Sequence, residues 1–433
     1  MRVVLYSIVL GICGCNASPT TPAASPPKPT APAVTLGNAA LETLPGDAPV
    51  DVSVRDAQAL VRTLPGEVDR WVALGEAWVR KARDAQSENL YGRAEDAAKK
   101  ALALQPGARG ALRIRALVHR NAHRFADMKT VADQLVKLDP KDPDGWGLLG
   151  DAQLELGAYD AAAESYQNMI DRRPALPAFT RIAWLRWLND DVEGALEMWE
   201  SAGAGTTGAA PETRAWLASE IGEVFWLKGD LVTAEIAFSK GLVVKPDHGP
   251  CLFGRGRVRW AQGDLPGAIA DLKASVAARR SEPVFAWLAA LHRAAGDTAQ
   301  AARIEAMLAT PEDFDDPRSA ALYLATRRLS PGRAVELAEV DMKARGDLFA
   351  EDALAFALLR AGRPGEAAKH MANALRLQTP HPMLWAHAGL IALAQGDKPN
   401  AKAHLQKALA LNPKFDPVLA PEIQGALAGL EAP

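Results

Sequence analysis

The stretch PDGWGLLGDAQLELGAYDAAAESYQNMIDRRP, residues 143 to 174, decides the fold, because it reads as two short helices with a break between them. The break is at Gly157, since glycine adopts the left-handed conformation that ends a helix without steric cost. The second helix stops at Pro174, which cannot continue it. The residues of the first helix that share one face by i, i+3, i+4 and i+7 spacing are Trp146, Leu149, Gly150 and Gln153.

Two small residues stand where the helices of this hairpin are expected to cross. Gly150 belongs to the first helix and Ala162 to the second, so the two backbones can approach closely at this point. Trp146 and Tyr166 are large enough to fill the space around the crossing. The stretch therefore predicts a helical hairpin with a packed seam.

The pattern resembles a tetratricopeptide repeat, in which W-x2-L-G-x2-Y is followed by A-x3-F and then by P. Gln153 stands where Tyr is usual, and Tyr166 replaces Phe. The resemblance implies a stack of helical hairpins whose concave groove takes peptide ligands. The residues that match the pattern are Trp146, Leu149, Gly150, Ala162, Tyr166 and Pro174.

The same frame recurs along most of the chain. Pro106, Pro140 and Pro174 are spaced by 34 residues, and about ten such units in near-constant register cover residues 67–413. One unit alone is a weak signal, but a series in constant register indicates a repeat architecture. We therefore predict an all-α fold, a right-handed superhelical solenoid of about ten tetratricopeptide-like helix-turn-helix repeats.

The ends of the solenoid and two loops within it depart from the repeat pattern. Residues 51–66 are expected to supply a leading helix and residues 414–433 a C-terminal capping helix, because terminal repeats need a solvated outer face. Irregular loops near 203–213 and 309–317 interrupt the stack. Loops with few contacts open readily, so both are possible hinges.

The N-terminal segment resembles a bacterial lipoprotein signal peptide. Residues 1–15 contain one Arg, an apolar run too short to span a bilayer as a helix, and Gly14-Cys15. The resemblance implies cleavage before Cys15 and lipidation of its thiol. Residues 16–50 contain eight Pro among Ala, Thr and Ser and should form a disordered tether. We expect a lipid-anchored protein of the cell envelope; Asn16, by the same resemblance, favours the outer membrane, with the protein facing the periplasm.

Composition and motifs disfavour several classes of function. A net charge of −3 and a pI of 6.3 give no electrostatic footprint for nucleic acid. Gly203, Gly205 and Gly208 match G-x-G-x-x-G, but the motif follows a predicted helix instead of a strand, so no nucleotide site is expected. Cys251 would be the one cysteine left after processing at Cys15, so no internal disulfide is expected. We predict no enzyme, no metal site and no cofactor.

Tryptophan is over-represented, with eleven Trp against ten Phe and five Tyr. At about 100° per residue, positions 4, 7, 8 and 11 of the first helix of a repeat form its packing face. Positions 2, 5, 9, 12 and 13 lie on the other side, and we call them the inner stripe; the resemblance implies that they line the concave groove. Anchors of protein interfaces favour Trp and Arg. The predicted partner-binding residues are Trp184, Trp187, Trp216, Trp226, Trp260, Arg257, Arg293 and Glu223.

Two interpretations of these tryptophans stay open, because they could instead pack against neighbouring repeats and close the groove. We predict a non-catalytic scaffold or adaptor that binds an extended peptide or a protein partner and reaches the membrane through its lipid anchor. A first alternative is a carbohydrate-binding or export accessory protein that uses Trp platforms. A second is a regulatory subunit of an envelope enzyme.

Overall fold

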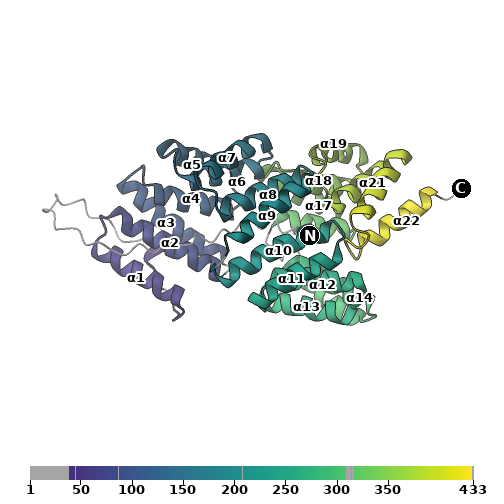
Figure 1. Ribbon diagram of the computed structural model, residues 1–433, viewed down its shortest axis with the longest axis horizontal. Coiled ribbons are helices and arrows are strands. Elements are labelled where there is room, and N and C mark those ends of the chain that lie inside the picture. The colour runs from purple at the N-terminus through teal and green to yellow at the C-terminus, as the bar shows by residue number, and fades with distance from the viewer. Residues whose placement is uncertain are drawn as a thin grey trace. The chain divides into compact units, whose positions relative to one another are not determined.

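The computed structural model describes residues 39–431 except 44, 86, 207, 309–313 and 315. The predicted signal peptide with Cys15, most of the predicted tether and part of the second predicted hinge lie outside the described residues. The described part is all-α (Figure 1). None of its helices combines the length and the apolar character needed to cross a bilayer.

The α-helices are α1 Pro49–Thr63, α2 Val68–Ala85, α3 Glu88–Leu104, α4 Arg109–Asn121, α5 Phe125–Leu138, α6 Pro143–Glu155, α7 Tyr159–Arg172, α8 Leu176–Leu188, α9 Val192–Ala204, α10 Pro211–Leu227, α11 Leu231–Val244, α12 Gly249–Gln262, α13 Leu265–Ala278, α14 Glu282–Ala294, α15 Thr298–Glu305, α16 Pro317–Thr326, α17 Pro331–Ala344, α18 Leu348–Arg360, α19 Pro364–Ala374, α20 Pro382–Ala394, α21 Lys398–Leu411 and α22 Leu419–Glu431.

The helices from α2 to α21 pack as ten successive hairpins, each made of an even-numbered helix and the helix that follows it. The first helices of neighbouring hairpins also touch, as α2 touches α4 and α10 touches α12. The prediction of an all-α solenoid of about ten repeats is confirmed. The helices α1 and α22 occupy the places of the predicted leading and capping helices.

Four of these ten hairpins share one turn, a Gly-Asp pair between the two helices. Gly229 has a φ of 72°, in the left-handed region that ends α10. Asp230 then caps α11, because its carboxylate accepts a hydrogen bond from the backbone N–H of Thr233 at 3.0 Å. The same pair recurs at Gly263-Asp264, Gly296-Asp297 and Gly396-Asp397.

Small residues at the helix crossings allow the close packing that the repeat pattern predicts. A Cβ atom added at Gly150 would lie 2.4 Å from the Tyr166 ring, so a larger residue would displace that ring. Ala162 on the facing helix is fully buried. Gly222 and Phe238 repeat the arrangement in a later hairpin, where the added Cβ would lie 2.6 Å from the ring.

The folded part begins before the predicted boundary at residue 51. A short 3-10 helix, Ala39–Leu41, packs at the start of the first repeat. The carbonyl oxygen of Ala40 accepts hydrogen bonds from the Trp78 indole at 2.9 Å and from the Gln58 amide at 3.0 Å. These bonds bury Ala40 completely and fix the chain onto α1 and α2.

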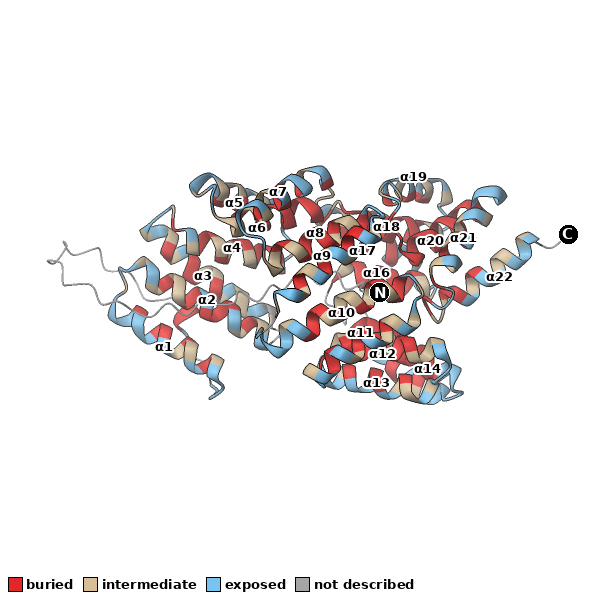
Figure 2. Cartoon of the chain, in the orientation of Figure 1, coloured by how far each residue is buried: buried red, intermediate tan, exposed pale blue. Residues whose placement is uncertain are grey.

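The chain divides into two compact units, which we call the first unit (described from residue 39 to 173) and the second unit (174 to 431). The division falls at residues 173–174, between α7 and α8, and not at either predicted hinge loop. Figure 2 shows that in each unit the buried residues follow the seams between helices. Whether the loops near 203–213 and 309–317 act as hinges stays a prediction.

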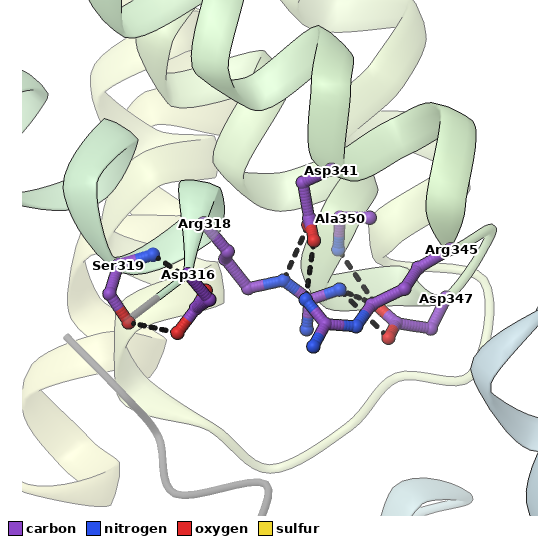
Figure 3. Close-up of polar contacts among 7 residues, drawn as sticks. All are labelled: Asp316, Arg318, Ser319, Asp341, Arg345, Asp347 and Ala350. Carbon is purple, nitrogen blue, oxygen red and sulfur yellow. Dashed lines mark hydrogen bonds and ion pairs between the residues drawn. The ribbon is translucent and has the colours of Figure 1, made fainter. Parts of the chain in front are cut away.

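A buried ion-pair network holds three consecutive helices of the second unit together (Figure 3). Arg318 of α16 donates to Asp341 of α17 at 2.6 Å and to both carboxylate oxygens of Asp347 at 2.9 Å. Arg345 also donates to Asp341, and all four side chains are more than nine-tenths buried. Two cations thus face two carboxylates, which offsets the cost of removing these charges from water. The sequence analysis did not find this network, because its members lie outside the repeat consensus.

Candidate functional site

The structure buries much of the predicted partner site. Trp187 and Trp226 are 0% and 1% exposed, and Trp216 and Arg257 are also buried. Trp184, Trp260 and Glu223 are half-buried, and Arg293 is exposed. The expectation that these tryptophans face solvent in the free protein is therefore not met for Trp187 and Trp226. Their assignment as partner-binding residues stays a prediction.

Trp226 belongs to a cluster of aromatic and charged side chains. The Arg257 guanidinium lies 5.0 Å from the Trp226 ring centre, a cation–π contact. It also forms a two-pronged ion pair with Glu223, with one bond at 3.1 Å. Trp287 packs edge-on against Trp226 and Trp260, with ring centres 6.2 and 5.4 Å apart. Trp287 is not among the predicted partner-binding residues, yet it contacts two of them in this cluster.

The loop that joins α19 to α20, residues 375–381, covers the end of α8. The Thr379 hydroxyl donates to the Leu188 carbonyl oxygen at 2.6 Å, across 191 residues of sequence. The His381 ring meets Trp187 edge-on at 6.1 Å between ring centres. Thr379 and His381 are 0% and 1% exposed, so the C-terminal end of this loop is buried against α8.

The loop that joins α21 to α22, residues 412–418, covers the end of α10. The Asn412 side-chain amide donates to the Trp226 carbonyl oxygen at 2.7 Å. The Leu411 carbonyl oxygen comes so close to Gly229 that a Cβ there would lie 2.7 Å from it. The Lys414 ammonium lies 5.6 Å from the Trp260 ring centre. We call residues 375–381 and 412–418 the closing loops, because each lies against the end of an inner-stripe helix of the same unit.

Sequence analysis missed the closing loops because no local signal marks them. Thr379, His381 and Asn412 lie between repeats, where the consensus assigns only a turn. Their partners are about 190 residues away and depend on how the stack curves. The Pro residues that flank them, Pro380 and Pro382, are ordinary turn residues by sequence.

Burial shifts the pKa of two groups in the second unit, His381 and Glu220. Burial, with help from nearby His387 and Arg257, lowers the pKa of His381 to about 3, so the ring is neutral at pH 7. Burial and the nearby carboxylate of Glu223 raise the pKa of Glu220 to about 8, although its side chain keeps some exposure. A neutral histidine and a protonated carboxyl are what a closed, water-poor interior favours.

A cysteine, a histidine and a glutamate lie together in the second unit, an arrangement that in other settings activates a nucleophilic thiol. The Sγ atom of Cys251 lies 3.1 Å from Nδ1 of His248, and Nε2 of that ring lies 3.7 Å from Glu212. The thiol, however, is fully buried and donates to the Ala215 carbonyl oxygen at 3.3 Å. Burial raises its pKa to about 12, so the reactive thiolate is scarcely populated at neutral pH. His248 instead caps α12 by accepting from the Cys251 backbone N–H.

The described residues contain no group of three or more His, Cys, Asp or Glu side chains that could hold a metal ion. Arg113, a cation on the inner stripe of the early repeats, pairs with Asp144. Arg120, another such cation, lies 3.9 Å from Asp151. These cations are thus already engaged by acidic residues of the next repeat.

The first unit carries a cavity of about 540 Å³ on the side of its inner stripe. Asp69 and Val72 of α2 form one wall, and Gly110 and Arg113 of α4 form another. These four residues occupy positions 2 and 5 of their repeats, the first half of the inner stripe. The other lining residues are Val68, Gln105, Ala108, Arg109, Asp139, Lys141 and Asp142.

Comparison with known proteins supports the repeat assignment. The tetratricopeptide repeat family model matches residues 115–177 and 353–414. The chain therefore contains tetratricopeptide repeats, and its fold is the helical solenoid that such repeats build.

Several solved structures are similar in fold. PilW, described as a widely conserved type IV pilus biogenesis factor, is 18% identical over 46% of this chain and 91% of that chain, with a TM-score of 0.40. A tetratricopeptide repeat protein from Parabacteroides merdae is 16% identical over 62% of this chain and 100% of that chain, with a TM-score of 0.33. Yeast Tom70 is 13% identical over 88% and 96%, with a TM-score of 0.34. No curated protein matches the chain. These similarities concern the fold alone.

Proposed function

We propose that this chain is a non-catalytic scaffold or adaptor lipoprotein of the bacterial envelope, which binds an extended peptide or a protein partner along its inner stripe. Lipidation at Cys15 would anchor it, and residues 16–38 would serve as a tether. The lipid anchor and the envelope location rest on the resemblance of residues 1–15 to a lipoprotein signal.

The observation that carries the binding proposal is the cavity of about 540 Å³ on the inner side of the first unit. It lies where the first helices of two neighbouring repeats present positions 2 and 5. Of the side chains at these positions, Asp69 is exposed and lines the cavity, whereas Arg113 pairs with Asp144 of the next repeat. The buried Cys251 thiol, with its raised pKa, supports a binding role over nucleophilic catalysis at that position.

The alternative of a carbohydrate-binding protein with Trp platforms has less support. A sugar ring stacks on an exposed aromatic face, yet Trp187 and Trp226 are buried. Trp184 and Trp260 keep partial exposure. A platform of two separated, half-buried rings is a weaker basis for sugar binding than the predicted stripe.

The test of the scaffold proposal is crosslinking of the full chain in intact cells, followed by affinity capture and mass spectrometry. Photo-crosslinkers placed at Val72 and at exposed Ile236 on the outer face of α11 compare the two surfaces. Specific protein adducts at Val72 and not at Ile236 are expected. Equal adducts at both sites, or recovery of polysaccharide alone, would contradict the proposal.

The test of the anchor is separate. Cys15→Ala should leave the chain without a lipid and move it out of the membrane fraction, because stable anchoring needs more than one acyl chain. Identical fractionation of wild type and variant would show that the lipoprotein assignment is wrong.

A further inference from the structure

Three exposed apolar side chains share one face of α11 in the second unit. Val232, Ile236 and Val243 are 67%, 49% and 84% exposed. They follow one another at steps of four and seven residues, so they lie in a row along the helix. Exposed Val and Ile gain nothing from burial, and they form helices less readily than Glu, Lys or Arg. The stability of the single chain therefore gives no reason for this row, which we call the α11 stripe.

The corresponding face is charged in most other repeats. Ile236 is the second residue after Ala234, which holds the place of Ala162 in its own repeat. Most other repeats carry a charged residue there, and the exposed examples are Glu164, Glu197, Arg303, Glu336 and Lys369. In the next repeat, the outer face of α13 adds small apolar residues to the surface, namely exposed Pro266, Ala270, Ala274 and Ala277. The apolar surface is thus a departure from the repeat pattern that extends beyond one helix.

The α11 stripe has the spacing of the seam of a two-stranded coiled coil, in which steps of four and three residues keep one face toward a partner helix. Glu235 and Lys240 flank this seam on opposite sides and differ in charge. They are five residues apart, so in two parallel helices each would lie across the seam from the opposite charge of the other helix. The seam residues are Val232, Ile236, Ser239 and Val243.

Both flanking charges are available to a partner helix. Lys240 is exposed, and its ammonium forms no ion pair with any residue that the structure describes. Glu235 is half-buried and accepts a hydrogen bond from the Gln262 amide at 2.9 Å, and among the described residues it likewise has no ion pair. An antiparallel pair of α11 helices would bring each flank against its own copy, so like charges would meet. The charges therefore favour parallel helices.

The preceding second helix, α9, favours the same orientation. Its outer face carries exposed Glu193, Glu197 and Glu200. Successive repeats stack in order, so in a parallel pair α9 of one copy faces α13 of the other, where Lys273 is exposed. In an antiparallel pair α9 would face α9, and its glutamates would repel one another. The same glutamates disfavour an anionic lipid surface as the occupant of this face.

We propose that the α11 stripe is the contact between two copies of this chain, which pack with their α11 helices parallel about a two-fold axis. Ile236 and Val243 of each copy meet in the seam, and Glu235 of each copy pairs with Lys240 of the other. The hairpin stack already holds α11 in its helical form, so pairing needs little further ordering. A contact centred on one 14-residue helix is small, so the dimer is weak and depends on concentration. This inference does not rest on the proposed scaffold function.

The first experiment is sedimentation equilibrium of the full chain over about a hundredfold range of concentration, in which monomer should convert to dimer. Ile236→Lys should weaken the association at least about tenfold, because it places a charge in the seam. The variant should still fold, since Lys369 stands at the same position of another repeat, and thermal unfolding checks this. Glu164→Lys, at the same position of α7, is the control and should associate as the wild type does.

A charge exchange separates a specific pair from a sticky apolar surface. Glu235→Lys alone and Lys240→Glu alone should each weaken the dimer about tenfold, because two symmetric ion pairs become like-charge contacts. The double variant Glu235→Lys/Lys240→Glu restores opposite charges across the seam and should associate nearly as the wild type does. A double variant that associates no better than the single variants would overturn the pairing.

Disulfide crosslinking in intact cells tests the orientation. Two Val243→Cys chains should crosslink on mild oxidation, because parallel helices bring this position against its own copy. In an antiparallel pair Val243 would face Val232, and the two Val243 positions would lie about 16 Å apart along the helix. Asp171→Cys, at the same position of α7, is the control and should not crosslink above the wild type.

A wild-type chain that stays monomeric at every concentration would overturn the proposal. So would association that Ile236→Lys leaves unchanged, or equal crosslinking of Val243→Cys and Asp171→Cys. A photo-crosslinker at Ile236 should join two copies of this chain, whereas only adducts with other proteins bear on the scaffold function. Loss of the dimer in Ile236→Lys with capture at Val72 retained would show that the two surfaces act separately.

Discussion

The two units are built from the same helical hairpin, yet they use their inner stripes in opposite ways. In the second unit, Trp187 and Trp226 are buried: the Trp187 ring packs against His381, and the Trp226 ring packs against Arg257 and Trp287. In the first unit, Asp69 and Glu76 occupy inner-stripe positions and remain exposed. The compared residues hold different positions of the repeat, 12 for the two tryptophans and 2 and 9 for the two carboxylates. Position 12 is also buried in the first unit, where it is occupied by Val79, Arg120 and Leu154.

The chemical nature of the inward-facing side chains and the curvature of the stack together determine which of these side chains are buried. Large apolar side chains on an inner stripe gain free energy when covered, about 25 cal/mol for each Å² of apolar surface removed from water. A stack that returns toward its own start can supply that cover from its own loops. Carboxylates lose hydration when covered, so exposed Asp69 and Glu76 of α2 are most stable in contact with water.

The largest expected effect is on the closed unit. Trp226→Ala removes a side chain that is 1% exposed and contacts Arg257 and Trp287. Loss of that packing should destabilise the second unit by about 3–5 kcal/mol. Urea unfolding followed by circular dichroism measures it. Val232→Ala, at a site 67% exposed on α11, should change stability by less than about 0.5 kcal/mol. Comparable losses in the two variants would mean that Trp226 is not a packing centre.

Acid should open the closed unit through His381. Its folded pKa, about 3, lies below its ordinary value of 6.5, so between these values the unfolded chain binds more protons. The stability from neutral His381 is full above pH 6.5 and is lost as the pH falls through this window, by about 2 kcal/mol between pH 6.5 and 5. Unfolding of wild type and His381→Gln at each pH isolates this contribution, since both retain Glu220. The raised pKa of Glu220 acts in the opposite direction. Parallel pH profiles for the two proteins would contradict the assignment.

A smaller effect should follow from loosening one closing loop. Thr379→Val keeps the shape of a fully buried side chain but removes its hydrogen bond to the Leu188 carbonyl oxygen. We expect a loss of about 1 kcal/mol and faster amide hydrogen exchange in residues 375–381. Thr130→Val is the matched control, since its hydroxyl makes an exposed local bond to Ala126 within α5. Unchanged exchange in the loop would show that this bond does not hold the loop in place.

The smallest expected effect is on the stability of the exposed unit. Asp69→Asn and Glu76→Gln alter exposed carboxylates without ion pairs in the described structure, so each should change stability by less than about 0.5 kcal/mol. Thermal unfolding measures it. A large loss would mean that these residues hold the repeats together, and their contrast with Trp226 would disappear.

Much of the fold was predictable because its signals are local. The seam around Gly150 and Ala162 is encoded by side-chain size within one hairpin, and the structure shows it as predicted. The Gly-Asp turn, as at Gly229-Asp230, is likewise a matter of backbone conformation and capping over a few residues. Repetition then extends each local rule along the chain, so the count of about ten repeats needed no long-range knowledge.

The candidate site was less predictable, because it depends on where distant segments meet. The partners of Trp187 and of the Trp226 carbonyl oxygen, His381 and Asn412, lie far along the sequence, and nothing in the repeat pattern pairs them. The sequence by itself determined the helical hairpins, their register and the residues that can face inward. Only the tertiary structure decided that the closing loops lie against the ends of α8 and α10. The physical reason is that small angles between successive repeats add up over many units, and no local pattern of residues states their sum.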